Sequence, residues 1–317
     1  MKSLWIVILN YNTLALLQRC VQTLRALEVE CARIVVVDNN SSDGSREWLG
    51  TQAGSGLSVH LLDENRGFAA GNNVGIRHAL EQGADTVLLL NSDAFPLPGS
   101  LQRLLALMEA RPEVAVVGPQ LLYADGSWQR SGGSAPSPWY AMLEAFGFPS
   151  LARAAQAALW PLIKERQWPR PIGYVDGACM LIRASVLRRI GLLDEGYFFF
   201  VEDVEFCARA RAHGYQVLLD GSTRVTHLRG SSSARKNRLA SETMKRNAME
   251  RFVRGQYGVA GWSRYARWTR RNYLWRGALC RFTSRLGFGS AERCAQYALV
   301  AQVYTAALEA VDAARSG

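Results

Sequence analysis

Short runs of apolar residues alternate with helical patterns along the first half of the chain. The runs are four to six residues long and consist mostly of Val, Ile and Leu, which is typical of strands buried on both faces. They predict strands at residues 4–9, 34–37, 57–62, 86–90 and 114–117. Apolar residues at helical spacing predict helices near residues 14–24, 45–49, 71–80 and 101–108. This alternation predicts an α/β fold with a mainly parallel central sheet flanked by helices.

Polar clusters follow three of the predicted strands. Asn10-Tyr11-Asn12 follows the first, Asp38-Asn39-Asn40 the second, and Asn91-Ser92-Asp93 the fourth. Ligands of parallel α/β sheets bind at the carboxyl ends of the strands. The clusters therefore indicate a ligand site at that edge of the sheet.

The pattern weakens between residues 124 and 171, a segment rich in Pro and Trp. Loops and short helices are expected there, forming a lid or an acceptor surface. Regular patterns return with a predicted strand at 178–182 and a predicted helix at 204–212.

Each candidate residue at the strand ends has a functional and a structural interpretation. The Asp38 carboxylate could accept hydrogen bonds from a nucleobase or a ribose, or it could close an Asx turn. Asp43 suits the N-cap of the following helix. Asp93 could hold Mg²⁺ or Mn²⁺, or cap the turn that precedes Pro96.

A Gly-containing loop spans residues 65–73 and leads into a helix. Its backbone N–H groups and Arg66 could meet a phosphate or a base. The spacing matches neither a P-loop nor a G-x-G-x-x-G motif, so neither standard nucleotide motif is indicated.

Three carboxylates, Glu202, Asp203 and Glu205, follow an apolar run. A carboxylate in apolar surroundings has a raised pKa, which suits a general base. Acidic residues are also favoured in the first turn of a helix, and Glu205 fits that structural role better than Asp203 does. His227 precedes a Gly/Ser-rich loop, so it is a candidate for metal or phosphate binding beside the ordinary structural role.

Composition narrows the class of protein. The 317 residues are 49% hydrophobic and 20% charged, which excludes a disordered, collagen-like or coiled-coil chain. Residues 229–317 hold 17 basic and 5 acidic residues, a net charge of +12, while the preceding residues carry −2. A basic region of this kind suggests an anionic partner, either a membrane surface or nucleic acid.

The cysteines and the apolar segments give further expectations. None of the six cysteines forms a C-x-x-C pair, so free thiols in a reducing compartment are expected. The apolar run near the start is too short for a signal peptide, and no run of about 18 apolar residues predicts a transmembrane helix.

Five motifs in order resemble a known family. They are Asn10-Tyr11-Asn12, Asp38 through Ser45, Glu64 through Asn73, Asn91-Ser92-Asp93, and Asp194-Glu195 followed by Glu202 through Glu205. Over residues 3–235 the sequence resembles a family 2 glycosyltransferase with the GT-A fold. The Asp-Asn-Asn-Ser-Ser-Asp and Asn-Arg-Gly-Phe-Ala motifs resemble more narrowly the bacterial rhamnosyltransferase branch.

The resemblance implies roles for individual residues. Asp203 would be the general base, with Glu202 beside it. Asp93 and His227 would hold Mg²⁺ or Mn²⁺ against the diphosphate, although the usual Asp-x-Asp motif here begins with Asn91. The implied nucleotide-binding residues are Leu9, Tyr11, Asp38, Asn40, Arg66 and Ser92.

The C-terminal region interleaves aromatic residues with arginines. Trp262, Tyr265, Trp268 and Trp275 can share a broad helical face, and Arg264, Arg267, Arg270 and Arg271 lie beside or across from it. The pattern favours a helix at the interface of an anionic membrane. A helix that packs its aromatic side chains on the protein body is the alternative; nucleic-acid binding is not expected, because no known module is present.

These observations combine into one hypothesis. Residues 1–235 would form the glycosyltransferase domain, with a nucleotide-binding half at 1–120 and an acceptor and catalytic half at 121–235; residues 236–317 would form a basic helical region. The enzyme would be an inverting, metal-dependent hexosyltransferase that moves L-rhamnose from dTDP-L-rhamnose to a saccharide, lipid-linked or free, in cell-envelope polysaccharide synthesis. It would be cytoplasmic and peripheral on the inner face of the membrane. A UDP-sugar donor, or a non-catalytic basic binding protein, are the alternatives.

Overall fold

The structure is a computed structural model that describes residues 3–27, 29, 32–52, 56–147, 168–228, 238–286 and 290–316. The chain forms two compact units. The first unit comprises residues 1–134 and 162–233, and the second comprises residues 135–161 and 234–317. The predicted division into domains at residue 235 stays a prediction.

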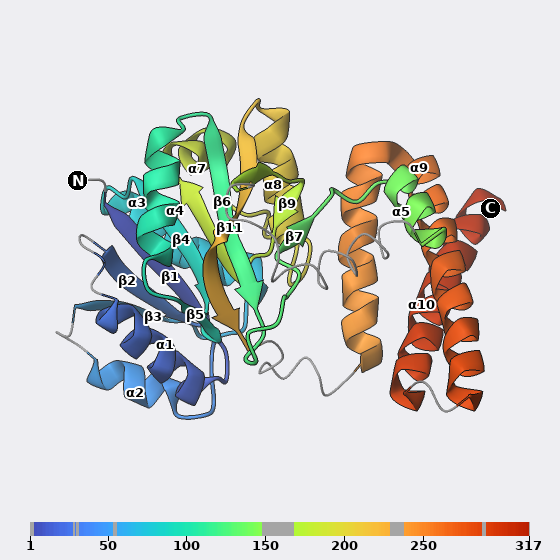
Figure 1. Cartoon of the computed structure of the whole chain (residues 1–317), viewed down its shortest axis with the longest axis horizontal. Helices are drawn as coiled ribbons and strands as arrows, with labels where there is room; N and C mark the ends of the chain where they lie inside the picture. The colour runs from blue at the N-terminus through green and yellow to red at the C-terminus, as the bar shows by residue number, and fades with distance from the viewer. Residues whose placement is uncertain are drawn as a thin grey trace. The chain divides into compact units, whose positions relative to one another are not determined.

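The first unit is built on a nine-stranded sheet in the order β3-β2-β1-β4-β10-β6-β11-β5, with β8 paired to β11 (Figure 1). A separate two-stranded sheet joins β7 and β9. The strands are β1 (Leu4–Asn10), β2 (Ala32–Asp38), β3 (Leu57–Leu61), β4 (Thr86–Asn91), β5 (Ala94–Pro96), β6 (Val114–Leu122), β7 (Gly132–Gly133), β8 (Arg170–Pro171), β9 (Tyr174–Val175), β10 (Cys179–Arg183) and β11 (Gln216–His227).

The sheet has the parallel strands of the predicted α/β architecture, but it is mixed because it also contains antiparallel pairs. β1, β2, β3 and β4 are parallel neighbours, and β6 runs parallel to β11. β10 is antiparallel to both β4 and β6, a reversal that the apolar pattern of the sequence does not reveal. The strand predicted at 114–117 continues to Leu122 and is buried along its whole length, because β10 and β11 flank it.

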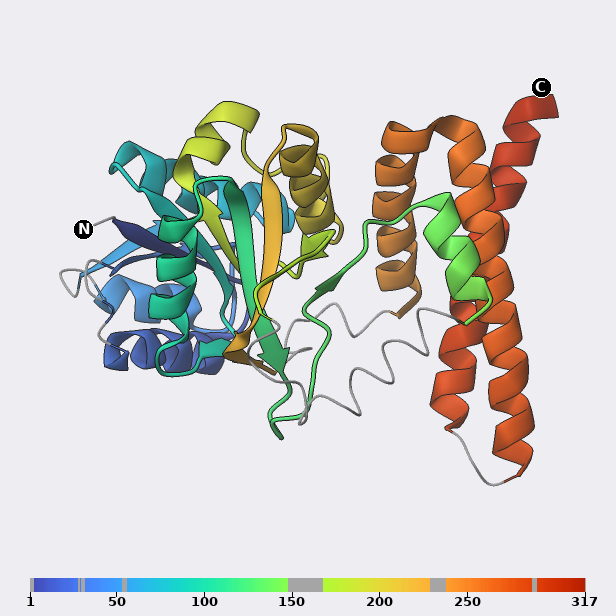
Figure 2. The same ribbon diagram turned by 45° about the horizontal axis from the view of Figure 1, so that its top comes forward.

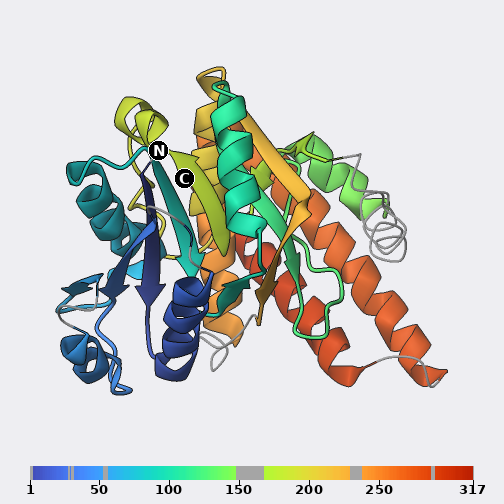
Figure 3. The same ribbon diagram turned by 60° about the vertical axis from the view of Figure 1, so that its left-hand side comes forward.

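Helices cover both faces of this sheet (Figure 3). They are α1 (Leu14–Ala26), α2 (Ser45–Thr51), α3 (Gly67–Glu81), α4 (Ser100–Ala110), α7 (Ala184–Ile190) and α8 (Glu202–Ala212). Alternate residues of β1 enter opposite cores: Ile6 packs with side chains of α1, α2 and α4, whereas Val7 packs with those of α3, α7 and α8. The apolar run of β1 is therefore continuous because both of its faces are covered.

The second unit is helical. It contains α5 (Pro138–Ala145), α9 (Arg238–Arg285) and α10 (Ala291–Ser316), and both α5 and α10 pack on α9. Figure 2 shows α9 turning back on itself, at a kink where Gly258 has φ 67°. Residues 148–167, the rest of the segment expected to form a lid or an acceptor surface, lie outside the described residues.

The aromatic face predicted for the C-terminal region is wrong in part. Trp262 is fully buried, and its ring lies 5.9 Å from Tyr265 and 6.0 Å from Tyr304 of α10. Trp268 is half-buried against Phe146, 5.8 Å away. Both faces of α9 carry aromatic residues, so helical spacing did not distinguish the packed face from the exposed one.

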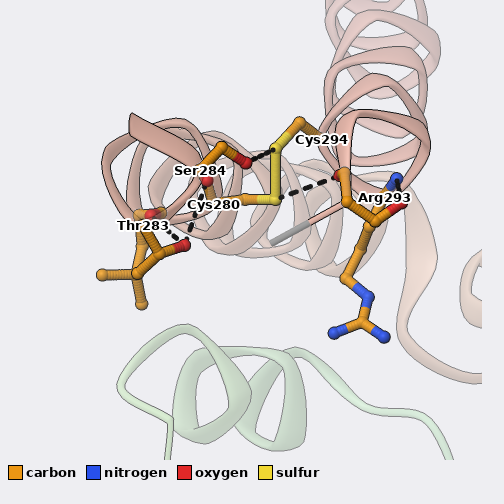
Figure 4. Close-up of a disulfide and its surroundings, with 7 residues drawn as sticks. Cys280, Thr283, Ser284, Arg293 and Cys294 are labelled. Atoms are coloured by element: carbon orange, nitrogen blue, oxygen red, sulfur yellow. Dashed lines mark hydrogen bonds between the residues drawn. A yellow bond between two sulfur atoms is a disulfide. The ribbon is translucent and has the colours of Figure 1, made fainter. Parts of the chain in front are cut away.

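A disulfide joins Cys280 of α9 to Cys294 of α10, with the two Cα atoms 5.5 Å apart (Figure 4). The expectation of free thiols is therefore wrong for this pair, because the helical hairpin brings together two cysteines separated by 14 positions. Cys20, Cys179 and Cys207 are free and buried, and Cys31 lies outside the described residues.

Within the described ranges, none of the helices is both long and apolar enough to cross a bilayer.

Candidate functional site

A buried hydrogen-bond network joins the carboxyl ends of β1, β2 and β4. The Asn10 amide donates to Asp38 Oδ1 at 2.8 Å, and the Thr13 hydroxyl donates to Asn10 Oδ1 at 2.7 Å. Because the Thr13 proton is directed at Asn10, the Ser92 hydroxyl must be the donor in its 2.8 Å contact with Thr13. The three polar clusters predicted to meet at the sheet edge therefore do so.

Asp38 is wholly enclosed by protein groups. Its Oδ2 accepts the Ser41 N–H at 2.9 Å and lies 3.5 Å from Arg46 Nη1, and its side chain has no exposed surface. Asp38 thus fixes the turn after β2. Its direct contact with a nucleobase stays a prediction.

The turns after β1 and β2 have a fixed backbone shape. Asn12 and Asn40 adopt positive φ values of 53° and 65°, which Asn tolerates better than most residues do. Tyr11 is half-buried and Asn40 is exposed. Both side chains belong to these turns, at the edge where the resemblance places the nucleotide.

The loop before α3 is attached to the turn after β2 by Asn39. The Asn39 side chain accepts the Arg66 N–H at 2.9 Å and donates to the Asn65 side chain at 2.9 Å. Arg66 is half-exposed and lies 3.4 Å from Glu64. Leu9 packs over Gly71, where an added Cβ would lie 2.5 Å from a Leu9 methyl carbon.

Gly67 allows this loop to touch the segment that carries the acidic pair. Its φ is +80°, and a Cβ there would lie 2.2 Å from the Phe198 carbonyl oxygen. The next residue, Phe68, donates its N–H to that same oxygen at 2.6 Å. Two motifs that are far apart in the sequence therefore meet because this position is glycine.

Unusual backbone conformations precede the acidic pair. Phe200 and Val201 have φ values of 75° and 73°, which are rare for a bulky residue and more so for a β-branched one. Strain of this kind persists where the surrounding structure enforces it, and it concentrates at functional sites. It places Glu202 and Asp203 at the first turn of α8.

Glu202 and Asp203 are carboxylates in a desolvated setting. Asp203 Oδ2 accepts the Gly177 N–H at 2.9 Å, and Oδ1 accepts the Val204 N–H at 2.7 Å. Burial, together with the nearby Asp176 carboxylate, raises the pKa of Asp203 to about 7. Burial and the charge of Asp203 raise the pKa of Glu202 well above its usual range. Glu202 Oε2 is buried and has no hydrogen-bond partner among the described residues.

Asp176 is a site residue that the sequence did not single out. It follows β9, its Oδ1 accepts the Ala178 N–H at 3.0 Å, and its negative charge acts on both Asp203 and Glu202. Its local signal is only an Asp-Gly pair after a two-residue strand, which also describes an ordinary turn.

Asp93 and His227 lie side by side, as predicted for a metal pair. Asp93 Oδ1 is 3.3 Å from His227 Nε2, and both side chains are more than nine-tenths buried. The Gln129 amide donates to the His227 carbonyl at 3.0 Å, so its Oε1 faces His227 Nδ1 at 2.8 Å. Nδ1 therefore carries a proton and donates to Gln129.

This arrangement fits a cation. With one proton on Nδ1, the other imidazole nitrogen, Nε2, faces Asp93 Oδ1 at 3.3 Å. Either a second proton on the imidazole or a cation between these two atoms makes this contact favourable. Hydrogen bonding of the other imidazole nitrogen is the usual support of a metal-binding His. Among the described residues no third His, Cys, Asp or Glu completes a cluster. Further ligands would come from substrate oxygens, as is common for Mg²⁺.

The Asp93–His227 pair and the acidic pair are connected by residues 129–131 and 176–178. Gln129 holds His227, and the Ser131 carbonyl accepts the Asp176 N–H at 3.0 Å. Gly177 binds Asp203, and the Ala178 carbonyl accepts the Asn91 N–H at 3.0 Å, at the end of β4. The acidic pair is thus tied to the strand that leads to Asp93.

Other acidic residues have structural roles. Asp43 accepts the Leu14 N–H of α1 at 2.8 Å and the Ser45 N–H of α2 at 3.1 Å. The N-cap residue of α2 is Gly44, so the N-cap position predicted for Asp43 is wrong by one residue. Glu205 forms an ion pair with Arg209 at 2.8 Å, one turn later on α8.

Several relatives found by sequence comparison have names that describe enzymes of glycan synthesis. The chain is 28% identical over 68% of its length to the low-salt glycan biosynthesis hexosyltransferase Agl10 of Haloferax volcanii, and the alignment spans 64% of that protein, less than two thirds. It is 25% identical over 73% of its length to an N-acetylglucosaminyl-diphospho-decaprenol L-rhamnosyltransferase of Mycobacterium tuberculosis, spanning 77% of that protein. It is 22% identical over 74% of its length to the dTDP-rhamnosyl transferase RfbF of Shigella flexneri, spanning 71% of it.

Solved structures share the fold. The mannosyltransferase PcManGT of Pyrobaculum calidifontis, in complex with GDP-Man and Mn²⁺, aligns over 98% of this chain and 84% of its own with a TM-score of 0.57 and 16% identity. GalNAc-T7, with UDP, GalNAc and Mn²⁺, aligns over 71% of this chain and 43% of its own with a TM-score of 0.53 and 16% identity. The fold of the first unit is thus the predicted GT-A fold.

The model of the family "Glycosyl transferase family 2" matches residues 5–191, more than half of the chain. That range contains four of the five motifs quoted from the sequence, and the fold agrees with it. The chain belongs to glycosyl transferase family 2.

Proposed function

We propose that this protein is an inverting glycosyltransferase that transfers L-rhamnose from dTDP-L-rhamnose to a saccharide acceptor in cell-envelope polysaccharide synthesis. Family membership supports glycosyl transfer. The names of two relatives, from Mycobacterium tuberculosis and Shigella flexneri, support rhamnose as the sugar, and the second supports dTDP as the carrier. The first of these names also supports a lipid-linked acceptor.

The observation that carries the proposal is the partly buried Asp203 carboxylate with its raised pKa. Because its pKa is raised to about 7, it can take a proton near neutral pH and yet be ionised in a large fraction of molecules. In the proposed reaction Asp203 accepts the proton of the acceptor hydroxyl. That oxygen bonds to the anomeric carbon as the bond from this carbon to the diphosphate breaks, which inverts its configuration. Glu202 stands beside Asp203, and burial together with the charge of Asp203 raises the pKa of Glu202 well above its usual range.

Asp93 and His227 are the residues that would hold Mg²⁺ or Mn²⁺. A divalent cation supplies charge stabilisation for the diphosphate as it leaves. The buried carboxylate oxygen suits either of these metals, whereas the imidazole nitrogen suits Mn²⁺ better than Mg²⁺, which takes oxygen ligands. Gln129 keeps the imidazole in place.

The nucleotide would bind at the strand-end network. Tyr11, Asn40 and Arg66 lie on the turns that this network joins, and Leu9 lies near the end of β1. Asp38 and Ser92 are its buried members, so we propose that they act by fixing the turns that the nucleotide contacts.

A lipid-linked acceptor would bring the protein to the cytoplasmic face of the membrane as a peripheral protein. The Haloferax relative is named only as a hexosyltransferase, which keeps another nucleotide sugar, such as a UDP-sugar, as the second candidate donor.

The test is thermal stabilisation of the purified protein by nucleotide diphosphates and nucleotide sugars, with and without Mn²⁺, followed by product analysis. Metal-dependent stabilisation by dTDP and dTDP-rhamnose, but not by UDP or GDP, is the expected result, because a ligand stabilises the state that it binds. Stabilisation by UDP compounds instead would reject the rhamnosyl donor and keep the enzyme class. No transfer of any sugar, with full folding, would favour a non-catalytic binding protein.

A further inference from the structure

The last part of α9 exposes a continuous apolar stripe. Trp275, Leu279 and Phe282 on α9 and Leu286 just beyond it are 59%, 45%, 61% and 58% exposed. Their spacing of four, three and four residues places them on one face of a helix. Exposed apolar side chains are usual singly, but a continuous patch marks an interaction site.

Arginines flank this stripe without acidic partners. Between Glu250 and Glu292 the sequence contains nine Arg and no Asp or Glu. Five of these arginines are exposed and form no salt bridge to any described residue; they are Arg264, Arg267, Arg271, Arg281 and Arg285. The apolar stripe and these five arginines are called the α9 surface below.

The basic residues earlier on α9 behave differently. Lys245 pairs with Glu242 at 2.9 Å, Arg246 with Glu250 at 2.8 Å, and Arg254 with Glu250 at 2.7 Å. The absence of partners is therefore specific to the part of the helix that carries the stripe.

The stripe is not the face of α9 that packs on α10. Gly277 and Cys280 lie on the opposite side of α9: a Cβ on Gly277 would be 3.6 Å from Tyr297 of α10, and Cys280 is bonded to Cys294. Ala266, eleven positions before Gly277 and therefore on the same side of the helix, is also buried. The disulfide and these contacts fix the rotation of α9, so the stripe faces away from α10.

We propose that the α9 surface lies in the interface of an anionic lipid bilayer. Helices that bind there combine apolar side chains entering the acyl boundary with arginines at the headgroup level. A second copy of the chain fits less well, because a two-fold contact would oppose the same arginines with no acid nearby. A nucleic acid would use the arginines but would leave Leu279 and Leu286 without a role. This inference does not rest on the proposed function.

The test is sedimentation of the full chain with vesicles of equal phosphatidylglycerol and phosphatidylcholine, against vesicles of phosphatidylcholine alone. We expect binding to the anionic vesicles. Adding about 0.5 M NaCl should weaken this binding, because salt screens charges. Replacing Arg271, Arg281 and Arg285 together by Gln should weaken it roughly 100-fold, because each arginine near an anionic surface contributes about a factor of five. The matched triple Arg→Lys variant keeps the charge and should keep most of the binding.

The apolar half is tested with Leu279→Ser combined with Phe282→Ser, which should weaken binding at least about tenfold. Trp139→Ser, which removes a 65% exposed aromatic residue of α5, is the control and should bind like the original chain. Thermal melting verifies that each variant folds. The fluorescence of Trp275, obtained by subtracting the spectrum of Trp275→Phe, should shift to shorter wavelength on anionic vesicles only.

Three outcomes would overturn the proposal. The first is equal binding to both kinds of vesicle, or binding that neither set of substitutions alters. The second is a dimer in analytical ultracentrifugation that Leu279→Ser with Phe282→Ser abolishes, which would make the surface a self-association site. The third is duplex DNA binding that depends on the same arginines while vesicles are not bound.

Discussion

The acidic site of the first unit and the α9 surface of the second both place charge beside apolar side chains, but in opposite ways. Glu202 is buried and Asp203 is partly buried, and desolvation raises the pKa values of both. The arginines of the α9 surface are exposed and form no salt bridge to any described residue. Desolvated charge alters protonation and so prepares chemistry, whereas exposed charge prepares association. Sequence composition alone does not separate the two cases.

The chemical role of the desolvated acidic site is tested most severely at Asp203. Asp203→Asn should lower kcat by about 10²–10⁴-fold, the range of a general base, and leave nucleotide binding nearly intact. Glu205→Gln, two positions later on the same helix, is the control and should keep most of the activity, because Glu205 only pairs with Arg209. Transfer rates from dTDP-rhamnose measure both. Unchanged turnover in Asp203→Asn would remove Asp203 from the role of base.

The second unit contains a disulfide between α9 and α10, whereas the cysteines described in the first unit are free. Cys280→Ser combined with Cys294→Ser should lower the stability of the second unit by about 3 kcal/mol. The reason is that the disulfide joins two positions 14 residues apart and so restricts the unfolded chain. Chemical denaturation under oxidising conditions measures the loss. A reductant should produce the same loss in the original chain and none in the variant; equal stability of the two proteins without reductant would refute the prediction.

Gly67 tests whether the acidic site depends on a close backbone approach. Gly67→Ala should destabilise the first unit by about 2–3 kcal/mol, because it adds a strained φ and an overlap with the Phe198 carbonyl. Gly83→Ala is the matched control: its φ is +77°, but no atom lies within 4 Å of the added carbon. Its cost should be only the conformational part, about 1 kcal/mol. Equal losses in denaturant melts would show that the contact with Phe198 has no weight.

Gln129 tests whether the hydrogen bond to His227 Nδ1 supports metal binding by Asp93 and His227. Gln129→Met keeps the volume but removes the acceptor for His227 Nδ1, and it should raise the Mn²⁺ concentration needed for nucleotide-dependent stabilisation by about 10–100-fold. Melting without metal separates this effect from a general loss of stability. An unchanged Mn²⁺ requirement would argue against His227 as a ligand.

Asp176 gives the smallest effect, a shift in pH dependence. Since Asp203 must be ionised to act, kcat/KM should rise with pH through about 7. Asp176→Asn keeps the acceptor for Ala178 but removes a negative charge, so the pKa of Asp203 should fall and the acidic limb should move to lower pH. A pH profile of both proteins measures it, and an unmoved limb would contradict the coupling.

The same raised pKa affects stability. The folded chain binds the Asp203 proton more tightly than the unfolded chain, whose Asp titrates near about 4. The protonation of Asp203 therefore adds to the free energy of unfolding fully at low pH, and this addition is lost as pH rises from about 4 to about 7.

The sequence predicted the sheet and the strand-end clusters well, because buried parallel strands leave continuous apolar runs and their ends meet at one edge. It did not predict the reversed strand β10, since an apolar run is the same in either direction. Asp93 and His227 were predicted together through family resemblance; their spacing of 134 positions contains no such signal.

The residues that were missed depend on long-range contacts. Gln129 lies in a segment without periodicity and gains its role only by facing His227. Asp176 acts on Asp203 through a turn that Gly177 closes. Trp262 and Trp275 look alike in the sequence, yet one is buried and the other exposed, because only the packing of α10 decides which side of α9 is inside.

The second unit is assembled from two separate stretches of chain, and this limits how the protein can be divided. α5 enters the unit from the middle of the sequence, and Phe146, just beyond its end, meets Trp268 of α9. Deleting residues 236–317 would therefore not remove an appendage; it would leave α5 as a solvent-exposed stub without its partner. Any chimaera that exchanges this unit between relatives has to transplant residues 135–161 together with the C-terminal helices.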